Sequence, residues 1–310
     1  MARNVPEWLT PTTLEEALEL RARYGDEATV VAGGTFIGIL VSQKIMIPSV
    51  LLVLRSVREL VFIAGNQFDR TTTGWSPLRI GAMTTHRAVE RSAVIRQQWP
   101  ILAYTFSLVA SPRVRNQATV GGVLADADYA SDPPALLHAL DARAVVRSVD
   151  GERAIPIEEF ITGYYETSLR PNELLVEVRI PRNVEQAVYR KFRSRSSEDR
   201  PCVAVAAARV GGKLRVVVGA VAERPQYFPD ICSLADGEQL TRELAIEIGR
   251  RYAESITPIS DSRGSGEYRS RVIAVEVRRA LEGFLSERLS EAGREIGVGS
   301  LHTEETSFHE

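Results

Sequence analysis

Two pairs of adjacent glycines, each following apolar or β-branched residues, constrain the fold of this chain more than any other feature. The first pair, Gly33-Gly34, ends the apolar run in "TVVAGGTFIGIL", which covers residues 29–40. Consecutive residues without a Cβ allow successive backbone N–H groups to converge on an anion, and the hydroxyl of Thr35 adds a donor. The segment therefore predicts a strand followed by a turn that suits a pyrophosphate group.

This first pair matches neither of the two familiar phosphate-binding loops. A Walker loop requires Gly-Lys-Ser or Gly-Lys-Thr after its spacer residues, and a dinucleotide fingerprint requires a third glycine in register. The segment "AGGTFIG" has neither arrangement. A tight turn between packed elements is the alternative explanation for Gly33 and Gly34.

The second pair, Gly121-Gly122, lies in "RNQATVGGVLADADYASDPPALL", residues 115–137. Thr119 precedes it on a strand-like approach, and a polar segment then leads through Asp132 into an apolar helix. Two such segments in one chain predict two sides of one ligand site. Asp132 has two interpretations: a helix N-cap, since two prolines follow it, or an acceptor for ligand hydroxyls.

Composition excludes several classes of protein. The formal net charge is −2 and the Lys and Arg residues are scattered, which argues against a nucleic-acid or anionic-membrane surface. Cys202 and Cys232 are too few for an iron-sulfur cluster, a structural zinc site or a disulfide scaffold. Lys44 and Pro48 interrupt the longest apolar stretch, and the N-terminus lacks a signal-peptide pattern. We therefore expect a cytoplasmic chain without a membrane span.

Local patterns predict a mixture of helices and strands. A capping box at Thr13 and a stop at Gly25 predict a helix between them. A hairpin is expected at Asp150-Gly151, and Pro181 ends a strand that we place at a sheet edge. The other predicted elements are strands at "ATVV", "PSVLLVL", "LRIG" and "VYRKF", a strand pair about Gly211-Gly212, and a long C-terminal helix on which Val277, Ala280, Leu281, Phe284 and Leu285 recur at helical spacing.

In order and spacing, several segments resemble the FAD-binding medium subunit of molybdenum hydroxylases, the relatives of carbon monoxide dehydrogenase and xanthine dehydrogenase. The segments are "VVAGGTFIG", "IGAMTTH", "RNQATVGGVLADADYASDPPALL", "NELLVEVRIP", "YRKFRSR" with "VAVAAA", and "EYRSRVIAVEVRRAL", within residues 5–290. The resemblance implies an α+β chain. A two-subdomain FAD-binding fold of the vanillyl-alcohol-oxidase type precedes a small α/β domain with a three-stranded sheet. The expected boundaries are 1–55 and 56–180 for the two FAD-binding subdomains, 181–292 for the C-terminal domain and 293–310 for a polar tail.

The resemblance also implies which residues hold FAD. The first glycine segment would wrap the pyrophosphate, Thr119 and Gly122 would touch the nucleotide, and Asp132 would contact it from the end of the motif. The implied cofactor-binding residues are Ala32, Gly33, Gly34, Thr35, Ile37, Thr84, Thr119, Gly122, Asp132, Leu175 and Lys191.

Three of these residues lie outside the two glycine segments. Leu175 and Lys191 match positions near the isoalloxazine ring, and Thr84 is favoured over the neighbouring His86 as a further contact. A cation at Lys191 beside the flavin N1 and C2 would stabilise reduced, anionic flavin. A solvated basic strand face is the alternative explanation for Lys191, and Leu175 is expected to be buried on either interpretation.

Four residues depart from the family's pattern. Phe36 stands where many relatives carry Asp, Val123 where many carry Asn or Ser, Asp126 where some carry His, and Tyr129 where many carry Pro. These departures affect the polar contacts at the edge of the ring and leave both glycine pairs intact. Tyr129 is a candidate aromatic gate over the flavin.

The resemblance implies that this chain is one component of an electron-transfer complex, with no catalytic residue and no metal site of its own. A large partner with a molybdopterin cofactor would hydroxylate the substrate, and a small partner with two two-iron two-sulfur clusters would pass the electrons to FAD on this chain. FAD would deliver them to an external acceptor, in a dimer of heterotrimers. The alternatives are a stand-alone FAD-dependent oxidase or reductase on the same fold, and a flavin-free scaffold.

Overall fold

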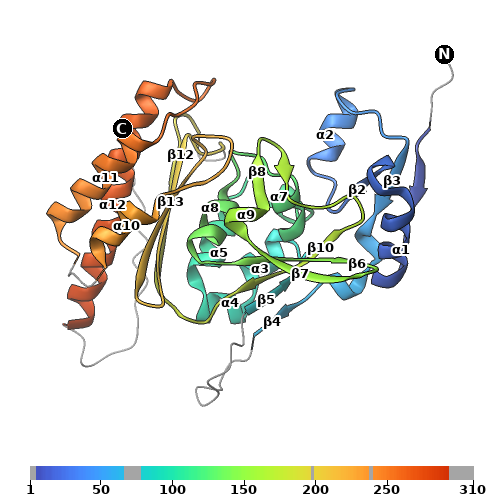
Figure 1. The fold of residues 1–310 in the computed structure, drawn as a ribbon, viewed down its shortest axis with the longest axis horizontal. Helices are drawn as coiled ribbons and strands as arrows, with labels where there is room; N and C mark the ends of the chain where they lie inside the picture. Colours follow the sequence, from blue (N-terminus) through green and yellow to red (C-terminus); the bar gives the residue numbers. More distant parts are fainter. Residues whose placement is uncertain (1–4, 66–77, 197–198, 237–239, 293–310) are drawn as a thin grey trace.

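The computed structural model describes residues 5–65, 78–196, 199–236 and 240–292. Three units follow one another along the long axis of the molecule (Figure 1): an N-terminal unit with a small sheet, a central unit with the largest sheet, and a C-terminal unit whose sheet carries helices on its outer face. Helices and mostly antiparallel sheets share the chain, as expected for the α+β class.

A parallel sheet organises the N-terminal unit. Its strands, in spatial order, are β1 (Glu7–Leu9), β3 (Val50–Val53) and β2 (Ala28–Val31). Helix α1 (Leu14–Tyr24) connects β1 to β2, with Thr13 as its N-cap and Gly25 as its C-cap, so the predicted helix is confirmed. Helix α2 (Ile37–Ser42) begins directly after the first glycine pair.

The central sheet is antiparallel. Its strands, in spatial order, are β4 (Ile63–Ala64), β5 (Leu78–Gly81), β10 (Leu174–Ile180), β6 (Arg143–Ser148) and β7 (Gly151–Pro156). The hairpin predicted at Asp150-Gly151 is confirmed by the pairing of β6 with β7. The edge position expected for the strand before Pro181 is wrong, because β10 pairs with β5 on one side and with β6 on the other. A separate ribbon consists of β8 (Ile161–Gly163) and β9 (Glu166–Thr167).

Short helices pack with the central sheet around one core. Ile80, Leu102, Phe106, Leu136 and Val178 are fully buried in it, and each such side chain contributes roughly 1.5–3 kcal/mol through its removal from water. The helices are α3 (His86–Arg91), α4 (Ala93–Gln98), α5 (Pro100–Ser107), α6 (Pro112–Arg115), α7 (Val120–Ala125), α8 (Asp132–Ala139) and α9 (Ile157–Phe160). Single 3₁₀ turns occupy Gly25–Glu27, Leu54–Ser56, Arg58–Leu60 and Ser233–Ala235.

The C-terminal sheet is buried on both faces. Its strands are β11 (Val184–Phe192), β12 (Val203–Val210), β13 (Lys213–Gly219) and β14 (Gln226–Tyr227), so the three expected strands gain a two-residue fourth. In β12, Ala204 and Ala206 face the core of the central unit, whereas Val203 and Val205 face the outer helices. Because successive side chains of a strand point to opposite faces, this alternation joins the sheet to both layers.

The outer helices are α10 (Pro229–Cys232), α11 (Arg242–Ser255) and α12 (Gly266–Ala292). The apolar stripe predicted for the long helix is confirmed, because Val277, Ala280, Leu281 and Phe284 are buried in the core that it shares with the C-terminal sheet. The predicted polar tail, 293–310, lies outside the described residues. Within the described part of the chain, no helix has the length and apolar character needed to cross a membrane.

Candidate cofactor site

The first glycine pair forms the turn between β2 and α2, and its two glycines are needed for different reasons. Gly34 has a φ of 71°, in the left-handed region that favours glycine. A Cβ on Gly33 would lie 1.9 Å from the carbonyl oxygen of Gln117, so no side chain fits there. The close approach at Gly33 therefore places the first turn directly against the start of the second glycine segment.

Successive backbone N–H groups of this turn, those of residues 33–37, donate no hydrogen bond to any residue that the structure describes. The carbonyl oxygens of Gly34 and Phe36 accept bonds from the first residues of α2, so the turn is ordered while its donors remain available. The turn is half-buried, and the Thr35 hydroxyl also lacks a partner within the described ranges. We call residues 32–37 the amide cradle. Successive free N–H groups next to glycines suit an anion such as a diphosphate.

The second glycine pair lies in the first turn of helix α7. The strand-like approach predicted for it is reduced to an isolated antiparallel bridge between Thr119 and Thr85, and no strand directly precedes the pair among the described residues. Thr119 is the N-cap of this helix, and its hydroxyl accepts a 3.0 Å hydrogen bond from the Gly122 amide. The extended backbone of Thr119 and its β-branched side chain resemble a strand locally, but the cap begins a helix there. Gly121 is needed for packing, because a Cβ on it would lie 2.6 Å from the Cβ of Ala82.

The two glycine segments are neighbours. A Cβ on Gly122 would lie 3.7 Å from the Cβ of Ala32, which belongs to the amide cradle. This contact and the approach of Gly33 to Gln117 bring Ala32, Gly33 and Gly122 into one place although they are far apart in the sequence. Ala32, Gly33 and Gly122 therefore form one cluster, whereas Asp132 of the second segment has its described partners elsewhere.

The Thr84 hydroxyl and the Nε2 of His86 already have hydrogen-bond partners inside the protein. The buried Thr84 hydroxyl donates to the Phe62 carbonyl at 2.9 Å and accepts from the Phe62 amide at 3.2 Å. The Nε2 of His86 donates to the Thr119 carbonyl at 3.1 Å. Burial lowers the pKa of His86 to about 4, so the ring is neutral at neutral pH. Both side chains act inside the protein, next to the second glycine segment.

Asp132 and Lys191 bind one another in the interior. The Lys191 Nζ is 2.8 Å from Oδ2 of Asp132 and donates to the Leu108 carbonyl at 2.9 Å, while the Tyr189 hydroxyl donates to Oδ1 at 2.8 Å. The exposed fractions of the two charged side chains are 2% and 5%. Burial raises the pKa of Asp132 and lowers the pKa of Lys191, and their mutual attraction opposes both shifts.

These contacts exclude one of the two alternatives for each residue, and the contact with FAD stays a prediction for both. Lys191 is not on a solvated strand face, because its ammonium group is buried. Asp132 is the first residue of α8, and Ser131 occupies the N-cap position instead. Leu175 is buried in the core of the central unit, beside the irregularity in pairing between Leu175 and Glu177.

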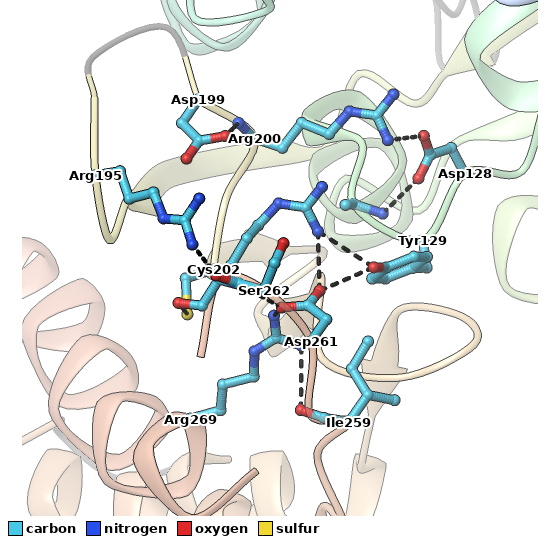
Figure 2. Close-up of polar contacts among 12 residues, drawn as sticks. Asp128, Tyr129, Arg195, Asp199, Arg200, Cys202, Ile259, Asp261, Ser262 and Arg269 are labelled. Carbon is cyan, nitrogen blue, oxygen red and sulfur yellow. Dashed lines mark hydrogen bonds and ion pairs between the residues drawn. The ribbon is translucent and has the colours of Figure 1, made fainter. Parts of the chain in front are cut away.

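Tyr129 lies where the central unit meets the C-terminal unit (Figure 2). Its hydroxyl donates to Asp261 Oδ2 at 2.9 Å and accepts from Arg263 Nη1 at 3.2 Å. Asp261 also accepts a 2.6 Å bond from the fully buried Arg269. Burial opposes ionisation of Asp261, but the hydrogen bonds from Arg269, the Arg263 amide and Tyr129 hold its pKa well below the usual value. The candidate gate residue is therefore anchored to the C-terminal unit.

An aromatic stack connects the amide cradle to the chain between α7 and α8. The ring of Phe36 lies 5.8 Å from that of Tyr165, nearly parallel to it, and the Tyr165 amide donates to the Ala127 carbonyl at 3.2 Å. Asp126 lies in the same stretch, and its carboxyl has no hydrogen-bond partner among the described residues. Burial, then the nearby Asp128 carboxylate, raise the pKa of Asp126 to about 7.

A surface cavity of about 610 Å³ lies elsewhere, between α1 and the central sheet. Its lining includes Leu18, Glu59, Phe62 and Glu177, and none of the predicted cofactor residues lines it. Glu59 is used to bind the Leu14 amide at the start of α1. The cavity therefore does not coincide with the candidate cofactor site, which is marked by the free donors of the amide cradle.

Sequence reasoning missed three residues that shape the site. Gln117 touches the cradle through its main chain, which no side-chain pattern reveals. Tyr189 lies two residues before Lys191, on the same face of β11, and that spacing was the available signal. Asp261 lies in "SDSRGSGEYR", where an acidic residue among arginines indicates an ion-pair cluster.

Two family descriptions match most of the chain. Residues 3–183 match the FAD binding domain in molybdopterin dehydrogenase, and residues 187–284 match the CO dehydrogenase flavoprotein C-terminal domain. The chain is 31% identical over 285 residues to the 6-hydroxypseudooxynicotine dehydrogenase complex subunit alpha of Paenarthrobacter nicotinovorans, covering 89% of this chain and 93% of that protein. It is 30% identical over 279 residues to the carbon monoxide dehydrogenase medium chain of Afipia carboxidovorans, covering 88% and 94%. A solved structure of carbon monoxide dehydrogenase from Hydrogenophaga pseudoflava, lacking the Mo-pyranopterin moiety of its molybdenum cofactor, matches with a TM-score of 0.82 at 28% identity, covering 91% of this chain and 98% of that one.

The fold and the cluster of glycine segments thus define an oxidoreductase subunit with an FAD-binding domain. The chain belongs to the family of FAD-binding domains in molybdopterin dehydrogenases, and it is similar throughout to medium subunits of such enzymes. The resemblance and the fold class inferred from the sequence are confirmed. The free N–H groups of the amide cradle fit the diphosphate of FAD. The domain boundaries at residues 55, 180 and 292 stay predictions.

Proposed function

We propose that this chain is the FAD-carrying electron-transfer subunit of a heteromeric molybdenum hydroxylase. A large partner subunit with a molybdopterin cofactor carries out the substrate chemistry, and a small partner with two two-iron two-sulfur clusters passes the electrons on. FAD on this chain delivers them to an external acceptor. The assembly is a dimer of heterotrimers. The names of the relatives, a complex subunit and a medium chain, support this division of labour.

The observation that carries the proposal is the amide cradle. The free N–H groups of residues 33–37 and the Thr35 hydroxyl bind the diphosphate, with Ala32 facing Gly122 across the site. Thr119 shapes this side by capping α7, and its bond to the Gly122 amide sets the direction of the helix. The remaining predicted residues belong to the site as buried supports: Thr84, Asp132, Leu175 and Lys191.

When bound, FAD supplies the electron transfer, and this chain's residues bind and orient it. The cradle donors offset the negative charge of the diphosphate without a positively charged side chain of their own. The buried ion pair of Asp132 and Lys191 fixes α8 against β11, so the central and C-terminal units keep one relative orientation beside the cofactor. No nucleophile or general acid of this chain is required.

Exposed apolar side chains support the assignment of partners. Trp8 is 61% exposed, Ile45 68% and Ile47 78%, all in the N-terminal unit that carries the cradle. Exposed apolar side chains that lie together in one patch mark surfaces that bind other proteins, and we propose that these three belong to such a surface. We therefore expect the chain to self-associate when it is produced alone. The cytoplasm is the proposed location, where thiols such as those of Cys202 and Cys232 stay reduced.

The test is to purify the chain with the proteins that accompany it in its own host and to record the visible spectrum of the complex. We expect one FAD per chain together with iron-sulfur absorbance, and reduction of the flavin after the clusters are reduced. A chain that takes up no flavin, even after incubation with FAD, would favour the scaffold alternative. A chain that oxidises a substrate without partners would favour the stand-alone enzyme.

A further inference from the structure

The stretch between α7 and α8, residues 126–131, is in contact with both the amide cradle and the C-terminal unit. On the cradle side, the Ala127 carbonyl accepts from the Tyr165 amide, and the Tyr165 ring stacks on Phe36. On the other side, Asp128 forms an ion pair with Arg200. We call residues 126–131 the connecting segment. Its two ends lead to Gly122 and Asp132, which both belong to the proposed cofactor site.

Of these contacts, that of Tyr129 has two hydrogen bonds to the C-terminal unit. Asp261 accepts the hydrogen bond of the Tyr129 hydroxyl. This carboxylate is itself fixed by Arg269, whose side chain is fully buried, and by Arg263 at 2.9 Å. Figure 2 shows the Tyr129 hydroxyl directed at this carboxylate across the boundary between the two units. A hydrogen bond to a carboxylate held in this way stabilises one position of the segment.

The neighbouring Tyr164 provides an internal comparison. Its ring lies 5.5 Å from that of Tyr129, edge to face, and is 42% exposed. Its hydroxyl has no hydrogen-bond partner among the described residues. The two rings pack against each other, but of the two hydroxyls only that of Tyr129 is bonded to the C-terminal unit.

We propose that Tyr129 is a positioning residue: its bond to Asp261 holds the connecting segment closed beside the cofactor and so limits the access of external acceptors to FAD. This inference rests on the proposed function. The closed arrangement also fixes the stack of Phe36 on Tyr165, because Tyr165 is bonded to the same segment. Loss of the bond opens the segment, and an open segment favours large acceptors more than small ones.

The test compares Tyr129→Phe with Tyr164→Phe in the full chain loaded with FAD. Each variant loses one hydroxyl, but only the first loses a described hydrogen bond. After reduction with dithionite, the flavin is reoxidised by oxygen or by cytochrome c. In Tyr129→Phe we expect the rate with cytochrome c to rise about tenfold, since a bond to a charged group shifts an open–closed equilibrium by roughly that factor. The rate with oxygen and all rates of Tyr164→Phe should change less than about twofold.

Hydrogen exchange gives a second readout that does not depend on FAD. In Tyr129→Phe, amides of the connecting segment and of residues 259–265 should exchange about tenfold faster, with or without the cofactor. The proposal would be overturned if flavin in Tyr129→Phe were reoxidised by cytochrome c at the wild-type rate and if the amides of this variant exchanged at the wild-type rate. If the wild-type chain binds no FAD while exchange in Tyr129→Phe rises as expected, the proposed function fails and the positioning contact stands. Should Tyr129→Phe not fold, Arg263→Met removes the 3.2 Å bond to the Tyr129 hydroxyl and the 2.9 Å bond that helps to fix Asp261. It weakens the anchor of Tyr129 without removing the bond to Asp261, so a smaller selective increase with cytochrome c is expected.

Discussion

Lys191 and Asp132 form a buried ion pair between β11 and α8, with Nζ 2.8 Å from Oδ2. The Tyr189 hydroxyl occupies the other carboxylate oxygen, so the carboxylate is bonded at both oxygens. Removal of one partner from a buried pair leaves an uncompensated charge, which typically costs about 3–5 kcal/mol. We expect Lys191→Met to lower the free energy of unfolding by about that amount in urea denaturation.

A matched control for this prediction is the exposed pair of Arg271 and Glu267 on α12. Because solvent screens exposed pairs, Glu267→Gln should change the free energy of unfolding by less than about 0.5 kcal/mol. Equal and small losses in both variants would show that Lys191 and Asp132 contribute no more than a surface pair.

Gly33→Ala tests the contact between the two glycine segments. The new Cβ would lie 1.9 Å from the backbone oxygen of Gln117, and a backbone atom cannot rotate away as a side chain does. We expect a loss of at least about 2 kcal/mol in the free energy of unfolding, measured by thermal or urea denaturation. Gly38→Ala, five residues later on α2, meets no atom within 4 Å and should be neutral or stabilising by up to about 1 kcal/mol. A stable Gly33→Ala variant would contradict the close approach.

Much of this architecture follows from local sequence. The helix from Leu14 to Tyr24 was predictable because its cap and stop are encoded within a few residues, and the hairpin at Asp150-Gly151 because its turn chemistry is local. The position of β10 was not predictable in this way. Its neighbours β5 and β6 come from distant parts of the chain, and the proline that ends the strand says nothing about how many partners the strand has.

Asp126 predicts a dependence of stability on pH. Its pKa is raised in the folded chain from 3.8 to about 7, so the folded state binds the proton more tightly than the unfolded state. The stability that this adds is fully present below pH 3.8 and is lost as the pH rises to about 7. Asp126→Asn should therefore stabilise the chain increasingly between pH 4 and pH 7, by roughly 1–3 kcal/mol at the upper end.

Denaturation in urea at several pH values provides the measurement. A constant effect of Asp126→Asn across this range would mean that the carboxyl is ionised as in the unfolded chain.

Some residues of the candidate site could be predicted from the sequence and others could not. Glycines 33 and 34 were recognisable as a pair that ends a strand. The positive φ of Gly34 agrees with the conformational freedom expected of glycine, whereas the need for Gly33, its close approach to Gln117, is a long-range contact that the local sequence does not reveal. The partner of Lys191 was not recognisable, because Asp132 lies 59 residues earlier in the chain and only the packing of α8 with the C-terminal unit brings the two together. For Thr119, the strand-like and cap interpretations share the same extended backbone, so only the bond from Gly122 separates them.

The most direct measurement is a titration of the purified chain with FAD, followed by flavin fluorescence, in wild type, Gly34→Ala and Gly212→Ala. Both glycines have positive φ, 71° and 79°, and neither new Cβ would meet a close atom. An L-residue in this region costs roughly 1–2 kcal/mol, which Gly34→Ala can relieve only by moving the cradle amides. We predict that wild type and Gly212→Ala bind one FAD with equal affinity and that Gly34→Ala binds about tenfold more weakly. Equal binding by all three proteins, or no binding by wild type, would contradict the assignment of residues 32–37 as the diphosphate site.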